Sequence, residues 1–431
     1  MQSRFRALRV RCGRGLLMLL GFAVGPASSL AEPLTLVDVE RLALADEPGL
    51  GAHLAEARAL REEAVADRQL PDPELTAAAF NFPVDGFDFD QEPITQVRVG
   101  VRQRIPGGGE RAARSALTNS RAAVIDEDAA LRVRNVLLAV RLAMIELAWR
   151  RDEARELSDS LLLLSELEKT SLSGYRQGRG AQQDVLRARL EQQVLQDRLA
   201  ANDAAQAMAR AELARWIGEK AWDAEPVLTA LPRDTEQEMG ALLGHPRLRA
   251  LDAALAVAER GVALARTGYA PDWSLEVTYG ARDQLSPVGD RPDFLTAAVS
   301  VQLPLFAANR QDRRLAARTG EREATRARRL DAQRDLERAL ASERSREREL
   351  LERLELHEVG LLPLAEENVA AARAGLATDT VDYAEVVRAA LAEIELRLRR
   401  DEIRWQLARS RAQLAWLTGD ARGTAFEENL Q

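Results

Sequence analysis

The sequence is poor in the residues that build disulfide frameworks and metal centres. Its 431 residues include one cysteine, Cys12, and three histidines, His53, His245 and His357, which lie far apart in the chain. A disulfide needs two cysteines, and a thiolate or imidazole metal site needs several ligands at a short, regular spacing. We therefore expect no disulfide, no metal site and no cofactor.

Common catalytic and nucleotide-binding motifs are also missing. Gly107-Gly108-Gly109 is a glycine run, but no Lys-Ser or Lys-Thr pair follows it, as a phosphate-binding loop would require. The sequence has no Gly-x-Ser-x-Gly nucleophile turn and no His-Glu-x-x-His zinc motif. Because no catalytic set is evident, we expect a protein that is not an enzyme.

An excess of basic charge, which nucleic-acid binding requires, is absent. Acidic residues outnumber basic residues by 68 to 60, and the formal net charge is -8. A surface that binds nucleic-acid phosphates needs a basic patch. Nucleic acid is therefore not an expected partner.

Long apolar runs are absent after the first residues of the chain. Several arginines between Arg4 and Arg14 precede the apolar stretch Leu16–Val24, and small residues follow at Ser29–Ala31. This order is typical of a secretory signal peptide, whose apolar core is shorter than a membrane-spanning helix. We expect cleavage after Ala31 and export, with a retained membrane anchor as the alternative. Any insertion of the remaining chain into a membrane is expected to use strands.

What the sequence does contain is one unit that occurs twice. Leu70-Pro-Asp-Pro-Glu-Leu75 resembles Ala270-Pro-Asp-Trp-Ser-Leu275, and Leu213–Gly218 resembles Leu414–Gly419, about 198 to 201 residues further along. Matches in the same order and spacing indicate a tandem duplication. The expected division is a signal peptide at 1–31, a first repeat at 34–220, a linker at 221–239, a second repeat at 240–420 and a C-terminal tail at 421–431.

Each unit combines two expected strands with a long helical hairpin. Val97, Val99 and Val101 alternate with polar or small residues, as do the apolar residues of Leu295–Gln302, which indicates strands with one apolar face. The long helical segments carry only a narrow apolar stripe among many charges, which is typical of contact along a coiled-coil seam. The expected strands are 74–82, 95–105, 273–281 and 294–303, and the expected helical hairpins are 110–217 and 310–418.

The expected strands cannot cover themselves. A two-stranded hairpin is only marginally stable alone, and open strand edges need partners. Lipid outside and water inside a β-barrel would explain the alternation, whereas a strand pair on a soluble sheet is the alternative. Four strands are too few to close a barrel, since the smallest have about eight, so several chains must contribute. The lumen of such a barrel is then expected to contain Arg98, Arg102, Ser300 and Gln302.

The order of these features resembles the outer-membrane efflux (TolC) family. The resemblance covers nearly the whole chain after the signal peptide, and it is most specific at Leu70–Leu75, Ile105–Arg111, Tyr175–Arg187 and Leu303–Arg310. It implies a mainly α fold with a β-barrel part. In this fold three chains with four strands each form a 12-stranded outer-membrane β-barrel, which a long periplasmic α-helical coiled-coil barrel continues. The Pro-Asp-Pro and Pro-Gly-Gly-Gly sequences are most similar to the heavy-metal efflux branch.

The same resemblance implies a function. The expected protein is a passive duct in the outer membrane of a Gram-negative bacterium, with a large periplasmic part, which exports heavy-metal ions or drugs. The resemblance implies that three copies of the chain assemble as a homotrimer. The other implied partners are outer-membrane lipid, a periplasmic adaptor (membrane fusion protein) and an inner-membrane transporter of RND type. The alternatives are a type I secretion duct, a periplasmic coiled-coil adaptor and a structural coiled coil.

The turns of the two helical hairpins lie farthest from the strands and are expected to form the inner tip of the tunnel. Asp184 matches the family's tip acid, but Asp382 follows Gly375 by one residue more than Asp184 follows Gly178. Pairs of opposite charges at the tip would hold the tunnel shut, and the small glycines would allow close approach of an adaptor. The alternative is that these are only solvated turn residues without either role. The expected gate and adaptor contacts are Tyr175, Arg176, Gly178, Arg179, Asp184, Gly375, Asp379, Asp382 and Glu385.

Overall fold

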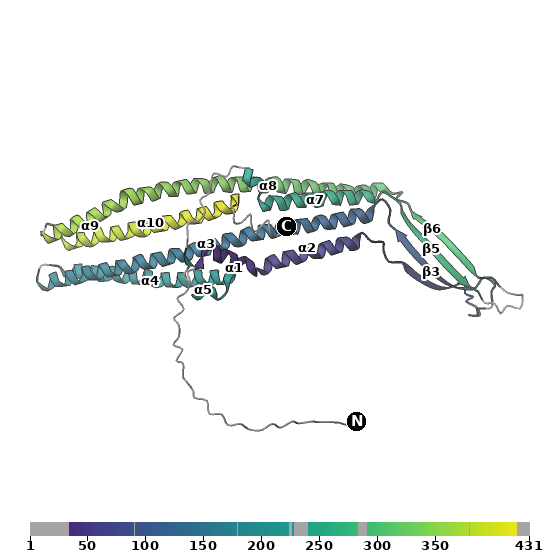
Figure 1. The fold of residues 1–431 in the computed structure, drawn as a ribbon, viewed down its shortest axis with the longest axis horizontal. Coiled ribbons are helices and arrows are strands. Elements are labelled where there is room, and N and C mark those ends of the chain that lie inside the picture. Colours follow the sequence, from purple (N-terminus) through teal and green to yellow (C-terminus); the bar gives the residue numbers. More distant parts are fainter. Residues whose placement is uncertain are drawn as a thin grey trace, which may run out of the picture.

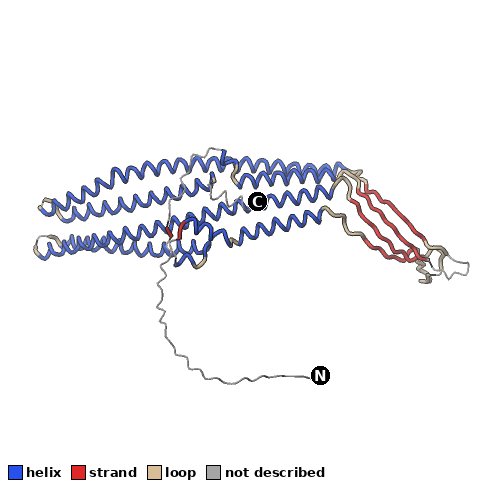
Figure 2. Tube along the Cα trace, in the orientation of Figure 1, coloured by secondary structure: helices blue, strands red, loops and turns tan. Residues whose placement is uncertain are grey.

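A computed structural model describes residues 34–89, 91–178, 180–223, 226–227, 240–282, 291–378 and 380–419. Long helices lie side by side, and a four-stranded sheet continues from one end of them (Figures 1 and 2). Both hairpin turns lie at the opposite end from the sheet (Figure 1). The expected signal peptide at 1–31 and the expected tail at 421–431 lie outside the described residues.

A single helix of 67 residues, α3 (Glu110–Arg176), organises the first half of the chain. At about 1.5 Å per residue it is about 100 Å long. Helix α2 (Pro48–Asp67) packs on the part of α3 near the sheet, and α4 (Gln182–Ile217) packs on its other part (Figure 1). Two shorter helices therefore share one long partner.

The second half is built around a long helix that changes its winding once. Helix α8 (Gln311–Glu355) passes through a π-helical segment, Leu356–Leu361, into α9 (Leu362–Ala377). Pro363 is the second residue of α9 and has no N–H to donate to the preceding turn, which accounts for a wider turn at this point. Helices α7 (Pro246–Thr267) and α10 (Tyr383–Thr418) pack along this long helix. None of the helices in the described ranges is long and apolar enough to cross a lipid bilayer.

Several short elements were not expected from the sequence. Helix α1 (Leu36–Ala45) begins at a capping box in which Thr35 and Asp38 satisfy each other's backbone N–H groups. Its apolar face, with Val39 fully buried, packs against α3 and α4. The remaining short elements are β1 (Leu34–Thr35), α5 (Lys220–Asp223), β4 (Pro226–Val227) and α6 (Gly240–Leu243).

The sequence had suggested that the range 221–239 is a linker, but part of this range forms secondary structure. Most of α5 and all of β4 lie inside it, and β4 pairs in parallel with β1. This pairing returns the end of the first helical hairpin to the start of the described chain. Two residues per strand give no periodic signal, so the sequence alone did not reveal it.

The sheet is antiparallel throughout and has the order β2-β3-β5-β6. Its strands are β2 (Glu74–Phe80), β3 (Gln96–Ile105), β5 (Asp272–Ala281) and β6 (Phe294–Gln302). The central pair joins the two halves of the chain, since Val99 lies opposite Tyr279. No strand pairs with the outer side of β2 or β6 within the described part of the chain, which leaves both edges open.

The helices pack through several small apolar clusters spread along the bundle. One lies around α1, α3 and α4, and a second joins both helical hairpins through Leu164, Leu195 and Val386. A third, around Leu248 and Leu336, connects α7, α8 and α10. The separate clusters follow from the narrow apolar stripe of each helix, which leaves much of its surface in contact with water.

Candidate functional site

The two faces of the sheet differ in polarity because the strand register places apolar side chains beside apolar ones on one face and polar side chains beside polar or small ones on the other. On one face Val99 lies between Ala77 and Tyr279, and on the other Gly100 lies between Thr76 and Thr278. We call the first the apolar face. Its apolar members are Leu75, Ala77, Ala79, Val97, Val99, Val101, Ile105, Trp273, Leu275, Val277, Tyr279, Ala281, Leu295, Ala297, Val299 and Val301, and Gln103 lies among them.

The apolar face is open in the isolated chain. Leu75 is 75% exposed, Leu295 is 76% exposed and Val299 is 65% exposed. A contiguous apolar surface of this kind marks contact with another protein or with a membrane. The face therefore needs a covering that the single chain does not supply.

The opposite face, which we call the polar face, carries ion pairs between strands. Nη2 of Arg102 lies 2.7 Å from Oε2 of Glu276 on β5, and the guanidinium of Arg98 stacks 3.3 Å from the ring centroid of Phe80. Nη2 of Arg104 lies 2.7 Å from Oδ2 of Asp272. These carboxylates keep two of the strand arginines paired on a face that also carries the hydroxyl side chains of Thr76, Thr278, Ser274 and Ser300.

The four residues expected in a lumen all lie on the polar face. Arg98 and Arg102 stand on β3, and Ser300 and Gln302 stand on β6, with Ser300 opposite Ser274 and Gln302 opposite Asp272. The partners Glu276 and Asp272 were not expected, because they pair with β3 from about 170 residues away in the sequence.

A tight junction connects the sheet to α3. The backbone N–H of Gly107 donates a 2.9 Å hydrogen bond to Oδ1 of Asp272. A Cβ atom at Gly107 would lie 1.8 Å from the carbonyl oxygen of Pro271, so only glycine fits there. Gly109 has a φ of 74°, in the left-handed region, and precedes the first residue of α3. The glycine run is thus explained by backbone contact at the strand-to-helix turn.

At the first hairpin tip α3 ends at Arg176, and Gly178 follows with a φ of 72°. Tyr175 is 45% exposed. Asp184 is the third residue of α4, and its carboxylate accepts a 3.4 Å hydrogen bond from the backbone N–H of Ala181. The expected contact residue Arg179 lies outside the described residues.

At the second tip Asp382 is the N-cap of α10, and its Oδ1 accepts a 2.9 Å hydrogen bond from the backbone N–H of Glu385. Glu385 also forms an ion pair with Arg388. A Cβ atom at Gly375 would lie 2.5 Å from Cγ2 of Val381, so this glycine is required by close packing. The remaining expected residue, Asp379, falls in a gap of the described chain.

The first residues of α4 and α10 show which residues of the two hairpin tips occupy equivalent positions. Glu385 is the third residue of α10, as Asp184 is of α4, whereas Asp382 takes the N-cap position that Ala181 holds in the first hairpin. The glycines also differ, because Gly178 has a positive φ outside its helix and Gly375 lies inside α9. An alignment of the two tips on Gly178 and Gly375, as used in the sequence analysis, therefore compares residues in different local structures.

Tyr383 is a tip residue that sequence reasoning missed. It is 9% exposed, lies in the apolar cluster that joins both hairpins, and donates a hydrogen bond from its hydroxyl to the carbonyl of Leu167. Burial, together with the nearby carboxylates of Asp184 and Glu168, raises the pKa of Tyr383 above its usual range. The phenol is therefore neutral and links the hairpins. The sequence signal that could have indicated this role is an aromatic residue directly after the N-cap aspartate Asp382.

The histidines and acids do not converge on a metal site. Within the described ranges, no group of three or more His, Cys, Asp or Glu residues is arranged to hold a metal ion. His245 is fully buried, packs edge-on against Trp416, and accepts a 3.1 Å hydrogen bond at Nδ1 from the backbone N–H of Arg247. Burial lowers the pKa of His245 to about 3, so it is a neutral capping residue of α7.

Comparison with solved structures identifies the fold. The outer-membrane channel OprN superposes with a TM-score of 0.76 at 17% identity, covering 90% of this chain and 90% of OprN. VceC, an outer membrane protein from Vibrio cholerae, gives a TM-score of 0.75 at 17% identity, covering 89% of this chain and 96% of VceC. CusC, which forms a transmembrane channel, gives 0.76 at 14% identity, covering 91% and 93%. Family models and curated protein sequences gave no match.

The chain has the fold of these outer-membrane channels, which is mainly helical with a small sheet. The resemblance to the TolC family that the sequence indicated is thereby confirmed in the fold.

Proposed function

We propose that this protein is the outer-membrane channel of a tripartite efflux system and acts as a passive duct. The observation that carries the proposal is the four-stranded sheet with one apolar face, one polar face and two open edges. Closure of such sheets from several chains would cover every edge, place the apolar face against lipid and enclose the polar face around water.

A homotrimer is the assembly that the proposal requires. Three chains with four strands each give a 12-stranded barrel, and their helices give the coiled-coil tunnel that continues it. The proposed tandem repeats, 34–220 and 240–420, are supported by the equal element order, in which α2-β2-β3-α3-α4 is followed by α7-β5-β6-α8-α9-α10. A sheet built from both repeats explains why its central pair is β3 and β5.

The proposed location is the outer membrane of a Gram-negative bacterium, with the helices in the periplasm. The partners proposed are a periplasmic adaptor and an inner-membrane transporter of RND type, which meet the channel at the hairpin tips. Heavy-metal ions or drugs are the proposed cargo, and a type I secretion duct remains the second candidate within the same fold.

Assembly can be tested with two substitutions on neighbouring residues of β6. Val299 lies on the exposed apolar face, and Ser300 lies on the polar face. We expect Val299→Asp to lower the yield of trimer in the outer-membrane fraction, because a carboxylate that faces lipid is destabilising, although by less than the roughly 2–4 kcal/mol of an Arg or Lys at the bilayer midplane. Ser300→Asp should leave the yield within about twofold of wild type, since it faces water.

Native mass spectrometry of the detergent-solubilised wild type should show three copies, and planar-bilayer recordings should show a pore. A stable monomer with protected strands would contradict the proposed assembly. Equal loss of trimer in both β6 variants would contradict the assignment of the two sheet faces.

The tip charges give a second test. Asp184→Asn together with Asp382→Ser removes two negative charges per chain, while serine retains the N-cap of α10. If the tip acids hold the tunnel shut through pairs worth about 1 kcal/mol each, the open fraction should rise by roughly fivefold or more. Single-channel recordings measure this change as the open probability, and trimer yield should stay constant.

The matched control is Asp152→Asn with Asp159→Ser, which removes the same charge from α3 outside the hairpin turns. A wild-type open probability in the tip variant, or an equal rise in the control, would show that Asp184 and Asp382 are solvated turn residues without a gating role.

A further inference from the structure

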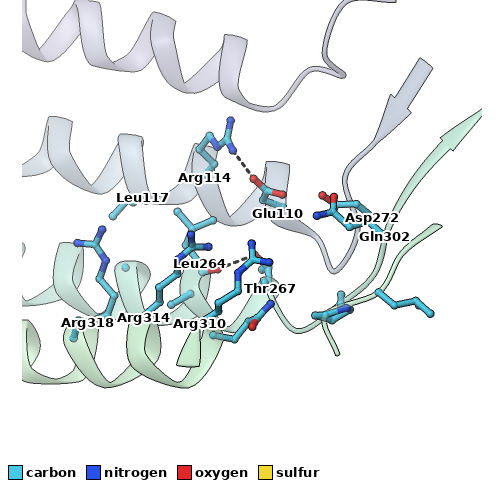
Figure 3. Close-up of a pocket in the computed structure, with 18 of the residues that line it drawn as sticks. Glu110, Arg114, Leu117, Leu264, Thr267, Asp272, Gln302, Arg310, Arg314 and Arg318 are labelled. Atoms are coloured by element: carbon cyan, nitrogen blue, oxygen red, sulfur yellow. Dashed lines mark hydrogen bonds and ion pairs between the residues drawn. The ribbon is translucent and has the colours of Figure 1, made fainter. Parts of the chain in front are cut away.

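An arginine-rich cavity lies where the sheet meets the helices (Figure 3). Its volume is about 590 Å³, and its walls come from α3, α7, α8 and the adjoining ends of three strands. Figure 3 shows Arg310, Arg314 and Arg318 extending from the start of α8 toward α3, which carries Arg114 and Glu110. The cavity also includes Arg104, Asp272 and Gln302, and is therefore continuous with the polar face of the sheet.

The charge in this cavity is positive although the whole chain is acidic. Its three carboxylates each have an arginine partner. Arg114 pairs with Glu110, the Arg104–Asp272 distance is 2.7 Å, and the Arg318–Glu321 distance is 2.8 Å.

Two arginines of the cavity are left over after this pairing. Arg310 and Arg314 have no carboxylate or hydrogen-bond acceptor among the residues that the structure describes. They stand one helical turn apart at the start of α8, so both guanidinium groups can reach one ligand. Guanidinium groups match the oxygen atoms of phosphate and carboxylate groups in charge and geometry.

Gln311 supplies an independent observation. It lines the same cavity, is only 8% exposed, and its Oε1 atom is buried without a hydrogen-bond partner among the described residues. A buried acceptor of this kind is costly unless a donor reaches it. A suitable ligand therefore offers acceptors to Arg310 and Arg314 together with one donor to Gln311.

We propose that this cavity binds a phosphate-bearing anion. Inorganic phosphate and phosphate monoesters near neutral pH carry negative oxygens for the two arginines, and their singly protonated forms carry a P–OH group that donates to Oε1 of Gln311. Sulfate has the same shape and charge but no proton to donate. A free metal cation is repelled by the unpaired arginines.

The proposal rests on the proposed function for its location, because the polar face is the water-filled side of the duct only in the assembled channel. Three copies would then place a ring of phosphate sites at the base of the barrel. This site refines the cargo proposed above, because its positive charge favours phosphate-bearing anions over the free heavy-metal ions named there.

The test is isothermal titration calorimetry of inorganic phosphate and of sulfate with the full chain in detergent. The test pair of substitutions is Arg310→Gln with Arg314→Gln. The control pair is Arg266→Gln with Arg313→Gln, which removes the same charge from exposed arginines outside the cavity. We expect the test pair to weaken phosphate binding by about tenfold or more, the control pair to change it by less than about twofold, and sulfate to bind at least about threefold more weakly than phosphate.

Three outcomes would overturn the assignment. No phosphate binding to the wild type removes the site, and equal loss in both variant pairs shows a general charge effect. Equal binding of sulfate removes the selection for phosphate. Gln311→Leu adds a separate check, because it should abolish the preference for phosphate while Arg310 and Arg314 remain.

A lipid headgroup carries the same phosphate chemistry, and the titration in nanodiscs distinguishes it. The affinity for inorganic phosphate should be equal in phosphatidylcholine and phosphatidylglycerol nanodiscs if the cavity opens to water. Loss of binding only in phosphatidylglycerol would assign the cavity to lipid and overturn its place in the duct. Calorimetry requires no conduction, so a protein that binds phosphate but forms no pore would contradict the proposed function alone.

Discussion

Substituting Gly107 with alanine is expected to destabilise the strand-to-helix junction by at least about 3 kcal/mol and to remove most of the protein from the membrane fraction. The added Cβ atom would lie 1.8 Å from the carbonyl oxygen of Pro271, which is backbone and cannot rotate away. A shift of Gly107 away from Pro271 would also disturb the 2.9 Å hydrogen bond from its backbone N–H to Asp272.

Two further glycines serve as controls for Gly107→Ala. A Cβ atom at Gly109 meets nothing within 4 Å, so Gly109→Ala adds only the strain of its positive φ, about 1–2 kcal/mol. Gly51 is exposed within α2 and also meets nothing, so Gly51→Ala should stabilise the helix by roughly 0.5–1 kcal/mol. Thermal unfolding followed by tryptophan fluorescence should rank the three variants in this order. Similar stability of Gly107→Ala and Gly109→Ala would contradict the close contact with Pro271.

Removing one member of the buried Glu40–Arg141 pair is expected to destabilise the protein by about 3–5 kcal/mol. Nε of Arg141 lies 2.7 Å from Oε1 of Glu40, and the two side chains are 3% and 1% exposed. The pair fastens α1 to α3, so Glu40→Ala leaves a guanidinium buried without this carboxylate. The free energy of unfolding should fall accordingly in thermal or denaturant unfolding of the detergent-solubilised protein.

An exposed pair on the same helix is the matched control. Nη1 of Arg41 lies 3.6 Å from Oδ1 of Asp38, and the two side chains are 68% and 43% exposed, so Arg41→Ala should change stability by less than about 1 kcal/mol. The double variant Glu40→Leu with Arg141→Met should recover most of the loss, because it removes both buried charges. Equal effects of Glu40→Ala and Arg41→Ala would show that burial of the first pair does not govern its contribution.

The periodic parts of this protein were readable from the sequence. The alternation of Val97, Val99 and Val101 predicted a strand over 95–105, and the structure has one at Gln96–Ile105. The sheet's first strand, expected over 74–82, ends at Phe80, where Asn81 adopts a φ of 53°. The long helices were recognisable because their apolar stripe repeats over many turns, which short elements cannot do.

The parts that depend on contacts between distant residues were not readable. The pairing of Arg102 with Glu276 follows from the register of β3 with β5, which local patterns do not determine. The tip register needed the helix starts, and the role of Tyr383 needed the packing of one hairpin on the other. Helix α1 had a readable signal in Thr35 and Asp38, but its ten residues are too few to stand out by periodicity.

The open edges of the sheet also have a genetic consequence. In the proposed closed ring of three, every chain would bond to two neighbours, so a chain with one faulty edge would spoil the assembly that it joins. Co-expression of equal amounts of wild-type and edge-defective chains would leave only about one in eight rings free of the defective chain, if subunits mix at random. A faulty edge would thus behave as a dominant allele, whereas a variant that fails before β2 and β6 form would be recessive.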